Sequence, residues 1–464
     1  MTNLTGSNLN NGLAVGPKGE GRDSPSTYPA YPEYKDSGVE WLGEIPEHWK
    51  VKKLRYLFEK IQTGTTPDTN KTEYFDGNIY WFNPKDLDNE LLKVSNKTLS
   101  NVAVEHGIVK LFPKNSVLIV AIGATTGKTS YLQVDSTFNQ QITGFHSTSE
   151  NNKYLFYLLK SLSIIFLNIA NYTTLPILNN EFFKSFILVR PAREEQTQIA
   201  TFLDRETQKI DRLIEKQQQL IKLLQEKRQA VISHAVTKGL NPNAKMKDSG
   251  VEWLGEIPEH WEVKRLKFAC SLVTKKVPTE NLKVIALENI ESQTGKYIQT
   301  DSIYTGEDVG FVGGDILFGK LRPYLAKVYM ADGCGVAFGD LLVYRPVDNV
   351  LSDYAFYQMI SDGFISTVDS STYGSKMPRA SVEFINDMPF LVPPLEEQNA
   401  VSEYVKSRIY QFEKLIDMTD MAIRLSKERR TALISAAVTG KIDVRNVAVN
   451  DTNSQITEQE VAAL

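Results

Sequence analysis

The sequence predicts an α+β fold: two mixed α/β domains joined by two long antiparallel helices that form a coiled coil, with an internal pseudo-two-fold duplication. Two repeats carry this prediction. The peptide KDSGVEWLGEIPEHW occupies residues 35–49 and recurs unchanged at 247–261. The segment REEQTQIATFL at 193–203 is similar to LEEQNAVSEYV at 395–405. The segments between these repeats show little similarity, so a variable domain is inserted twice into one duplicated frame.

Composition limits the class of protein. A chain of 464 residues is too long for one ordinary core. It has no apolar run of about 18 residues and no signal-peptide pattern at its start, so neither a transmembrane helix nor a signal peptide is expected. Two cysteines, Cys270 and Cys334, indicate a reducing compartment, and we expect a cytoplasmic protein. The 52 basic and 56 acidic residues exclude a simple polycation but allow local basic patches.

The two ends of the chain are polar and differ in composition from the rest. The first residues are rich in Asn, Gly, Ser, Thr and Pro, which is typical of disorder. The predicted boundaries are a disordered arm at 1–33, a first variable domain at 34–192, a first long helix at 193–240, a second variable domain at 241–393, a second long helix at 394–445 and a flexible tail at 446–464.

The two repeated helices are predicted from their period. Apolar residues recur at steps of three and four from Leu203 and from Val405, and Gly239 and Gly440 stand where each helix would end. A helix of this length, roughly 65 Å, favours a partner helix, although packing on its own variable domain alone is the alternative. The predicted core positions are Leu203, Ile210, Leu213, Leu220, Leu224, Val231, Val405, Phe412, Leu415, Ala422 and Leu433.

The variable domains show the same order of signals. Each has a β-like run, at 116–123 and 314–321, followed by a helical segment and a loop that contains proline. Divergent loops on a shared scaffold are expected when two copies recognise different targets. Residues 50–190 carry 16 basic and 11 acidic side chains, whereas residues 262–393 carry 13 and 16.

Three segments imitate catalytic or metal-binding motifs. GATTGKT at 123–129 has three residues between its glycines where a P-loop needs four, and a strand is predicted after it. FNPKD at 82–86 lacks the second proline and the aromatic of the methyltransferase motif. The Glu and His residues of the repeated peptide lack the spacing of ligands on a helix face, so a turn anchored by tryptophan is the better interpretation. A stand-alone methyltransferase or NTPase and a coiled-coil scaffold stay as alternatives.

The repeated GVEWLGEIPEHW peptide and the proline-rich lead into EEQ and a long helix resemble the specificity subunit of type I restriction–modification systems. Segments 61–87 and 120–141 resemble one family of target recognition domains, and 314–346 resembles another. The resemblance covers about residues 34–445. It implies two target recognition domains, one at 34–192 and one at 241–393.

The resemblance also implies a function and partners. The chain would be a non-catalytic subunit that reads a bipartite, asymmetric site in double-stranded DNA, one domain per half-site. The helices would set the spacer and dock two modification (methyltransferase) subunits, and restriction (translocase and nuclease) subunits would complete the enzyme. S-adenosylmethionine, ATP and magnesium would be used by those partners, and no cofactor or metal is expected in this chain.

Candidate DNA-contacting residues are loop side chains that can read base edges or bind phosphate. The fixed peptide itself is predicted to be a structural clasp next to the helix of the other half. The candidates are Thr65, Lys71, Lys85, Lys128, Asn139, Gln140, Gln141, Thr173 and Thr174 in the first domain, and Lys276, Lys320, Arg322, Tyr324, Lys327, Tyr373, Ser375, Lys376 and Arg379 in the second.

Overall fold

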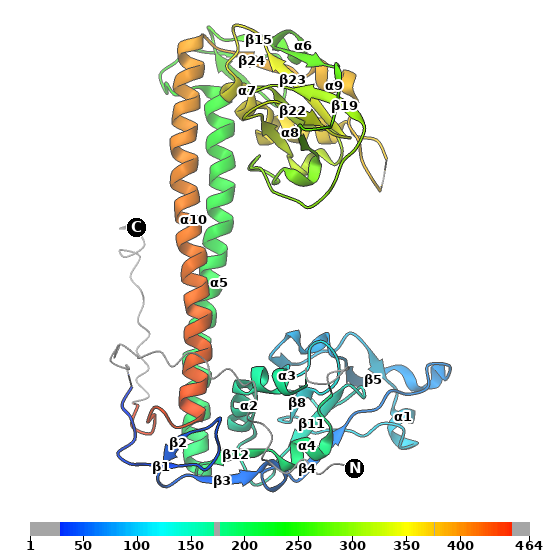
Figure 1. The fold of residues 1–464 in the computed structure, drawn as a ribbon, viewed down its shortest axis with the longest axis vertical. Helices are drawn as coiled ribbons and strands as arrows, with labels where there is room; N and C mark the ends of the chain where they lie inside the picture. The colour runs from blue at the N-terminus through cyan, green and yellow to red at the C-terminus, as the bar shows by residue number, and fades with distance from the viewer. Residues whose placement is uncertain (1–27, 171–176, 375, 448–464) are drawn as a thin grey trace. The chain divides into compact units, whose positions relative to one another are not determined.

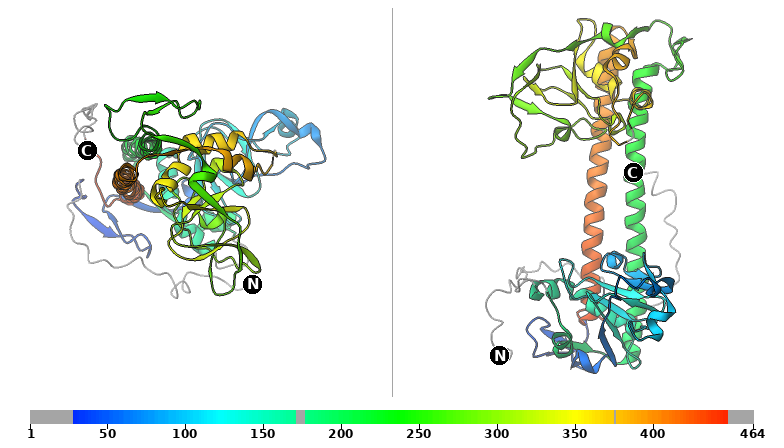
Figure 2. Two further views of the ribbon diagram at one scale, coloured as in Figure 1. Left: turned by 90° about the horizontal axis from the view of Figure 1, so that it is seen from above. Right: turned by 90° about the vertical axis from the view of Figure 1, so that its right-hand side faces the viewer.

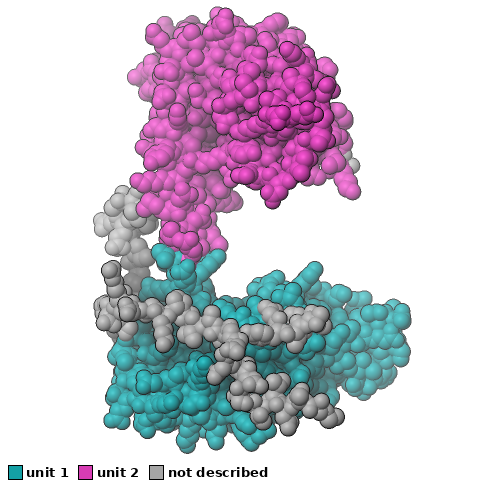
Figure 3. Space-filling view, viewed as in Figure 1, with its two compact units in different colours: residues 1–214, 425–464 teal, residues 215–424 magenta. Residues whose placement is uncertain are grey.

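The computed structural model describes residues 28–170, 177–374 and 376–447 (Figure 1). The chain divides into two compact units, coloured in Figure 3: unit 1 comprises Met1–Ile214 and Leu425–Leu464, and unit 2 comprises Glu215–Arg424. The two long helices, α5 (Arg193–Lys238) and α10 (Leu395–Val438), each begin in one unit and end in the other. Each unit therefore contains one variable domain, the start of the helix that follows it, and the end of the other helix.

The variable domain of unit 1 is built on a five-stranded sheet in the order β4-β11-β8-β9-β6, with a second sheet in the order β10-β5-β7. The helices α2 (Asn152–Ser161) and α3 (Ser163–Ala170) follow the sheet strands in the chain. The strands of the two sheets are β4 (Lys60–Thr63), β11 (Ile142–His146), β8 (Val117–Val120), β9 (Thr129–Leu132), β6 (Leu91–Leu92), β10 (Ser136–Phe138), β5 (Phe75–Phe82) and β7 (Thr98–Leu99), and the short helices are α1 (Asn101–Glu105) and α4 (Asn180–Ser185).

The variable domain of unit 2 has two four-stranded sheets, in the orders β16-β23-β20-β21 and β17-β19-β22-β18. Their strands are β16 (Cys270–Val273), β23 (Leu341–Pro346), β20 (Ile316–Gly319), β21 (Val328–Met330), β17 (Lys276–Pro278), β19 (Glu307–Phe311), β22 (Gly335–Ala337) and β18 (Lys283–Ile285). The helices are α6 (Leu266–Ala269), α7 (Ser352–Met359), α8 (Asp362–Ser370) and α9 (Val382–Asp387).

Both domains share one scaffold, as the sequence predicts. The orders β4-β11-β8-β9 and β16-β23-β20-β21 match strand for strand, and every neighbouring pair in both is antiparallel. The second sheets differ in strand number and order. The conserved pairing carries the core, while the loops that join the strands are free to differ.

The duplicated frame brings the entry and exit of each variable domain together. The strand β3 (Lys50–Lys53) pairs with β12 (Ile187–Arg190), and β15 (Glu262–Arg265) pairs with β24 (Pro389–Val392). Before each entry strand, the repeated peptide forms a hairpin, visible in blue and green in Figure 2 (left). The hairpin strands are β1 (Tyr34–Asp36) with β2 (Glu44–Pro46), and β13 (Met246–Asp248) with β14 (Glu256–Pro258).

The predicted clasp is present in each unit. Trp49 and Trp261 are fully buried, each beside the glycine that follows the end of a long helix. Gly440 has φ +78°, and a Cβ atom there would lie 2.4 Å from Cδ of Pro46. At Gly239, with φ +72°, a Cβ atom would lie 3.1 Å from the ring of Trp261. The clasp of each half thus packs against the end of the other half's helix.

The EEQ motif joins each helix to its variable domain. The Gln196 side chain accepts a hydrogen bond from the Asn151 amide (2.9 Å) and donates to the Pro191 carbonyl (3.1 Å). Its repeat, Gln398, accepts from the Leu351 amide (2.8 Å) and donates to the Pro393 carbonyl (2.8 Å). Both glutamines are fully buried, so these bonds satisfy polar groups that would otherwise be costly to bury.

The buried side of the long helices corrects part of the predicted core. Leu203, Ile210 and Val405 are buried as predicted, but Leu213, Leu220 and Leu415 are 40–46% exposed. Counted from Leu203 and from Val405, the buried and half-buried residues recur at steps of four and then three. Every second predicted core position is therefore one residue too early in the chain. Thr207, Arg228 and Ile423 are buried, and Ile214, Ile221, Ile409, Ile416 and Arg430 are half-buried, as are the predicted Leu224, Val231, Phe412, Ala422 and Leu433.

The ordered part of the chain extends beyond the predicted domain boundaries. Tyr31, within the predicted arm, is 4% exposed in the core of unit 1, and Tyr28 packs on Phe202 with ring centroids 5.0 Å apart. Val447, within the predicted tail, packs against the same core. Aromatic side chains anchor Tyr28 and Tyr31, although the proline- and glycine-rich sequence around them is typical of disorder.

The most apolar segment of the sequence is the bent helix pair α2–α3. Among the described residues, no single helix is long and apolar enough to cross a membrane, while these two together pass that test by length and composition, with a bend of 53°. Six consecutive residues of α2, from Tyr154 to Leu159, are buried in the core of unit 1.

Candidate nucleic-acid interface

In unit 1, most of the candidate DNA-contacting residues lie in loops at one end of the strands of the five-stranded sheet. We call this end the sheet edge. The strands β4 and β8 end at this edge, and their antiparallel neighbours β11 and β9 begin there. The Thr65 amide donates to the Phe138 carbonyl (3.0 Å), and the Ala121 amide donates to the Gln141 carbonyl (2.7 Å). The loops at 64–66, 122–128 and 139–141 therefore lie side by side.

The candidates at this edge differ in their availability. Thr65 and Gln140 are exposed, and Gln140 accepts a hydrogen bond from Thr66. Asn139 is 7% exposed, and its side chain accepts from the Gln141 amide (3.0 Å), so it shapes the turn. Lys128 forms an ion pair with Asp88. The strand β9 follows Lys128 directly, as predicted for a loop that is not a P-loop.

Two further lysines of unit 1 lie at different distances from this edge. Lys85 is exposed just after the end of β5, and the Asn139 amide donates to the carbonyl of Phe82 on that strand (3.0 Å), which brings Lys85 to the same edge. Lys71 is exposed at the start of a separate turn, 5.7 Å from the ring centroid of Tyr74. Among the described residues, no hydrogen bond links Lys71 to the loops of the group.

In unit 2, the equivalent edge lies where β20 ends and β21 and β23 begin. The loop that follows β20 is hydrogen-bonded to the loop at 373–380: the Arg322 amide donates to the Pro378 carbonyl (2.7 Å), and the Ala380 amide donates to the Lys320 carbonyl (3.0 Å). Tyr373 and Arg379 exchange backbone hydrogen bonds of 3.1 Å. The two clusters of basic and aromatic residues found in the sequence thus form one surface.

Arg379 forms an ion pair with Asp340 on this surface. Its guanidinium forms two hydrogen bonds to the Asp340 carboxylate, at 3.2 and 2.9 Å, which raise the pKa of Arg379. Lys320 lies 3.8 Å from the same carboxylate. An arginine held flat by a carboxylate keeps its free edge in a fixed direction, which suits two-point recognition of a guanine edge.

The remaining candidates of unit 2 vary in exposure. Tyr324 and Tyr373 are 51% and 64% exposed, and Lys376 is exposed between them and Arg379. Lys276 follows the end of β16 at the same sheet edge. Lys327 turns inward and donates to the Leu287 carbonyl (2.6 Å), and burial lowers its pKa. Thr173, Thr174 and Ser375 lie outside the described residues.

Backbone strain is concentrated in the loop after β20. Arg322 adopts φ 49° and ψ 63°, and Ala326 adopts φ 46° and ψ 47°. Residues other than glycine rarely adopt this left-handed conformation, which costs about 1–2 kcal/mol per residue. Arg322 is held by a hydrogen bond from its amide to the Pro378 carbonyl, and Ala326 by backbone hydrogen bonds with Pro323 and Gln293. Strain of this kind often accompanies a binding site.

The sequence interpretation missed the acidic partners Asp88 and Asp340, because nothing local marks a carboxylate that will meet a distant cation. It also missed a charged contact between each variable domain and the helices. In unit 1, Arg430 of α10 bonds Glu90 (2.8 Å) and Asp211 of α5 (2.8 Å). The Arg430 side chain is 13% exposed and those of Glu90 and Asp211 are 39% and 51% exposed, so the contact is partly buried.

The repeat places the same two charges in unit 2. Arg228 of α5 stands at the repeat position of Arg430, and Glu413 of α10 stands at that of Asp211. Arg228 donates to the Gln293 carbonyl, and Lys296 pairs with Glu413 at 2.7 Å. Burial lowers the pKa of Arg228, although Glu413 and Glu291 oppose that shift. These arginines connect each variable domain to the long helices.

Comparison with known proteins agrees with the duplicated architecture. Residues 46–223 match the family model described as "Type I restriction modification DNA specificity domain". Residues 46–223 are therefore similar to a type I DNA specificity domain. This match confirms the family resemblance predicted from the sequence, and specificity subunits of type I restriction–modification systems are also its relatives over the rest of the chain.

Two of these relatives are specificity subunits of Methanocaldococcus jannaschii. The chain is 31% identical to the type I restriction enzyme MjaIX specificity subunit over 252 residues, which are 50% of this chain and 54% of that protein. It spans about half the length of that relative. The MjaVIII specificity subunit is 21% identical over 427 residues, 87% of this chain and 95% of its own length.

A solved structure shows the same fold. The chain matches one from a study of complex assembly and conformational transition of the type I R-M system, with a TM-score of 0.65 and 13% sequence identity. The match covers 86% of this chain and 99% of the other.

Proposed function

We propose that this chain reads a bipartite, asymmetric DNA site, with one variable domain on each half-site, as the non-catalytic subunit of a type I restriction–modification enzyme. One observation carries the proposal. Two domains with the same four-stranded scaffold present different polar side chains at the same sheet edge. A shared scaffold with different edges suits two related binding events on two different sequences.

The helices would act as the spacer between the half-sites. Within unit 1, the start of α5 and the end of α10 share one core, with Leu203 and Val438 among its residues. Within unit 2, the end of α5 and the start of α10 share another, with Val236 and Val405. Both pairings support an antiparallel coiled coil, whose approximate two-fold symmetry suits a duplex.

The partners and cofactors follow from this role. Two modification (methyltransferase) subunits would dock on the helices and supply S-adenosylmethionine chemistry, and restriction subunits would supply ATP- and magnesium-dependent translocation and cleavage. A cytoplasmic location is part of the proposal. The mildly acidic second domain supports a model in which the methyltransferase subunits provide part of the positive charge around the DNA.

Methylome sequencing of a host that expresses the complete system tests the proposal. The expected result is methylated adenine at a motif of two short, different half-sites separated by a constant gap of unread bases. Replacing residues 54–186, which lie between β3 and β12, with those of another family member should change one half-site only. A continuous motif, or a change in both half-sites after the exchange, would contradict one-domain-per-half-site reading. Absence of any DNA retardation by the complete complex would favour the coiled-coil scaffold.

A further inference from the structure

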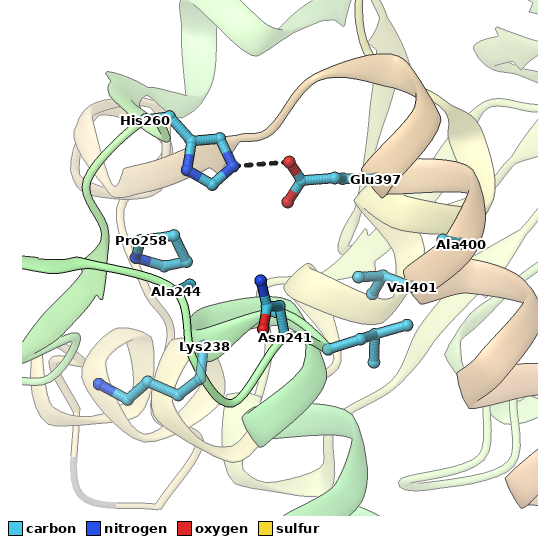
Figure 4. Close-up of a pocket in the computed structure, with 10 residues that line it drawn as sticks. Lys238, Asn241, Ala244, Pro258, His260, Glu397, Ala400 and Val401 are labelled. Carbon is cyan, nitrogen blue, oxygen red and sulfur yellow. Dashed lines mark hydrogen bonds and ion pairs between the residues drawn. The ribbon is translucent and has the colours of Figure 1, made fainter.

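Side chains that make the two half-sites different must themselves differ between the two variable domains. The polar contact of the clasp does not meet this condition, because it is repeated. In unit 2, His260 bonds Glu397 (2.6 Å) beside a pocket of about 310 Å³ (Figure 4). In unit 1, His48 bonds Glu195 in the same way (2.9 Å). The sheet edge, by contrast, carries different side chains on the same backbone.

One position at this edge is structurally equivalent in the two domains, and it holds Gln141 in unit 1 and Asp340 in unit 2. Gln141 directly precedes β11, and Asp340 directly precedes β23. The Gln141 carbonyl accepts from the amide of Ala121, the residue after β8 (2.7 Å). The Asp340 carbonyl accepts from the amide of Lys320, the residue after β20 (3.0 Å). The same backbone position therefore carries an amide side chain in one domain and a carboxylate in the other.

The Gln141 side chain is held in one orientation by Asn139. Oδ1 of Asn139 accepts from the backbone amide of Gln141 (3.0 Å), so the other end of the Asn139 amide is its NH2 group. This NH2 group donates to Oε1 of Gln141 (3.2 Å). The backbone N–H thus decides the orientation of both side-chain amides, which their shape alone does not reveal.

The remaining hydrogen-bonding capacity of Gln141 complements adenine. Its Nε2 has two N–H donors and no hydrogen-bond partner in the part of the chain that the structure describes, and its Oε1 can accept a second bond. The neighbour of Nε2 is Gly123, where even a Cβ atom would be 3.5 Å away, so no side chain at that position covers the amide. A glutamine amide that donates to N7 of adenine and accepts from its N6 amino group reads that base at two points.

We propose that Gln141 reads an adenine of the first half-site in the major groove, with Asn139 as its positioning residue. The inference rests on the proposed function and adds the identity of one base. In unit 2, Asp340 has the positioning role, because it holds the guanidinium of Arg379 (2.9 Å). Each domain thus fixes one recognition group with a second polar side chain, which reduces the conformational entropy lost on binding.

Competition gel shifts test the inference, with the complete methyltransferase complex and a duplex of the site found by methylome sequencing. The first half-site is the one that changes when residues 54–186 are exchanged. Each of its adenines, on either strand, is replaced in turn by 7-deazaadenine, which lacks N7 and keeps its base pairing. The methylated adenine is not the expected one, because a methyltransferase extrudes its target base from the stack.

At one adenine, the replacement should weaken binding by the native complex about tenfold. The same replacement should weaken binding by the Gln141→Ala complex less than about twofold, because the two changes remove one interaction. Gln133→Ala is the matched control and should keep the tenfold effect. Gln133 lies in the same domain but follows the end of β9 that is remote from the sheet edge.

Asn139→Asp tests the positioning role. Its carboxylate can still accept from the Gln141 backbone amide, so the turn is kept, but it cannot donate to Oε1. The Gln141 amide should then reverse and direct its oxygen toward N7 of adenine. The effect of 7-deazaadenine at that base should therefore disappear or change sign, whereas a merely structural Asn139 would leave it at about tenfold.

Two results overturn the inference: a first half-site with no adenine besides the methylated one, or an effect of 7-deazaadenine that persists at every adenine in Gln141→Ala. A bipartite native motif would still support the proposed function in both cases, whereas a continuous motif would contradict that function itself. If Asn139→Asp fails to fold, the comparison of the native and Gln141→Ala complexes still decides whether Gln141 reads adenine.

Discussion

At the residue scale, the two glycines behind the clasps have little tolerance for a side chain. Both have φ between +70° and +80°, where an alanine costs about 1–2 kcal/mol in backbone strain. At Gly440 the added Cβ would also overlap the ring of Pro46, which cannot move as a flexible side chain would. We expect Gly440→Ala to lower the free energy of unfolding by more than Gly239→Ala, measured by urea denaturation. Equal losses would contradict the closer packing at Gly440.

Glu59 contributes to the stability of unit 1, and this contribution is lost at acid pH. Burial raises the pKa of Glu59, but hydrogen bonds from the Ser149 hydroxyl (2.7 Å) and the Thr148 amide (2.8 Å) outweigh burial and lower it to about 2. A carboxylate with a lowered folded-state pKa stabilises the fold above its unfolded value, and this stability is lost as the pH falls toward the folded value.

The expected result is a fall in the urea midpoint of the native chain between about pH 4.5 and pH 2 that is reduced in Glu59→Gln. Glu105→Gln, at an exposed residue that ends α1, is the control and should keep the native pH dependence. If Glu59→Gln keeps the full dependence, other groups cause the acid loss.

At the scale of elements, the long helices test the corrected register. Leu220 is 46% exposed, whereas its neighbour Ile221 faces the buried side of α5. Replacing Ile221 by lysine removes buried apolar surface and should lower the free energy of unfolding by about 1–2 kcal/mol. Replacing Leu220 by lysine should change it by less than about 0.5 kcal/mol. Thermal unfolding of Ile221→Lys and Leu220→Lys compares the two positions on one turn of helix. A larger loss for Leu220→Lys would restore the register expected from the sequence.

The register error shows where sequence patterning reaches its limit. Leucine or isoleucine occupies both 213 and 214, and both 220 and 221, so the apolar stripe is wide enough to fit two starting steps. Contacts with the variable domains mark one of them: Thr207, 3% exposed, lies within hydrogen-bond distance of the Tyr157 hydroxyl, and Arg228, 6% exposed, donates to the Gln293 carbonyl. Neither residue type is typical of a core, yet both are buried because a variable domain contacts the helix there.

The candidate interface was predictable in outline for a different reason. Loops that join neighbouring antiparallel strands must meet at a sheet edge, so Thr65, Gln140 and Lys128 could be grouped from strand predictions alone. The pairing of Arg379 with Asp340 could not, because 39 residues separate them and only the tertiary fold brings them together. The sequence repeats were enough to predict the duplicated frame. The ion pairs between distant residues could be identified only from the structure.

At the scale of the whole molecule, the helices determine the geometry of recognition under the proposed function. Seven residues added to both helices, between Ile214 and Glu215 and between Arg424 and Leu425, preserve the apolar period and add roughly 10 Å. The spacer of the recognised site should lengthen by about three base pairs, with both half-sites unchanged, in methylome sequencing. The same insertion in one helix alone is the control and should abolish methylation. An unchanged spacer in the doubly extended chain would refute the spacer role.

The division of each helix between the two units has a consequence for synthesis. Unit 2 is one continuous stretch of chain, Glu215–Arg424, and all of its residues are synthesised before residues 425–464 are added. Unit 1 begins with the first residues translated, but its core also contains Ile434, Ala437 and Val438 from the end of α10. The half that is translated first is thus the half that folds last. A nascent chain that stops short of residue 425 would carry a complete second unit and a first unit that still exposes the apolar surface meant for the missing helix.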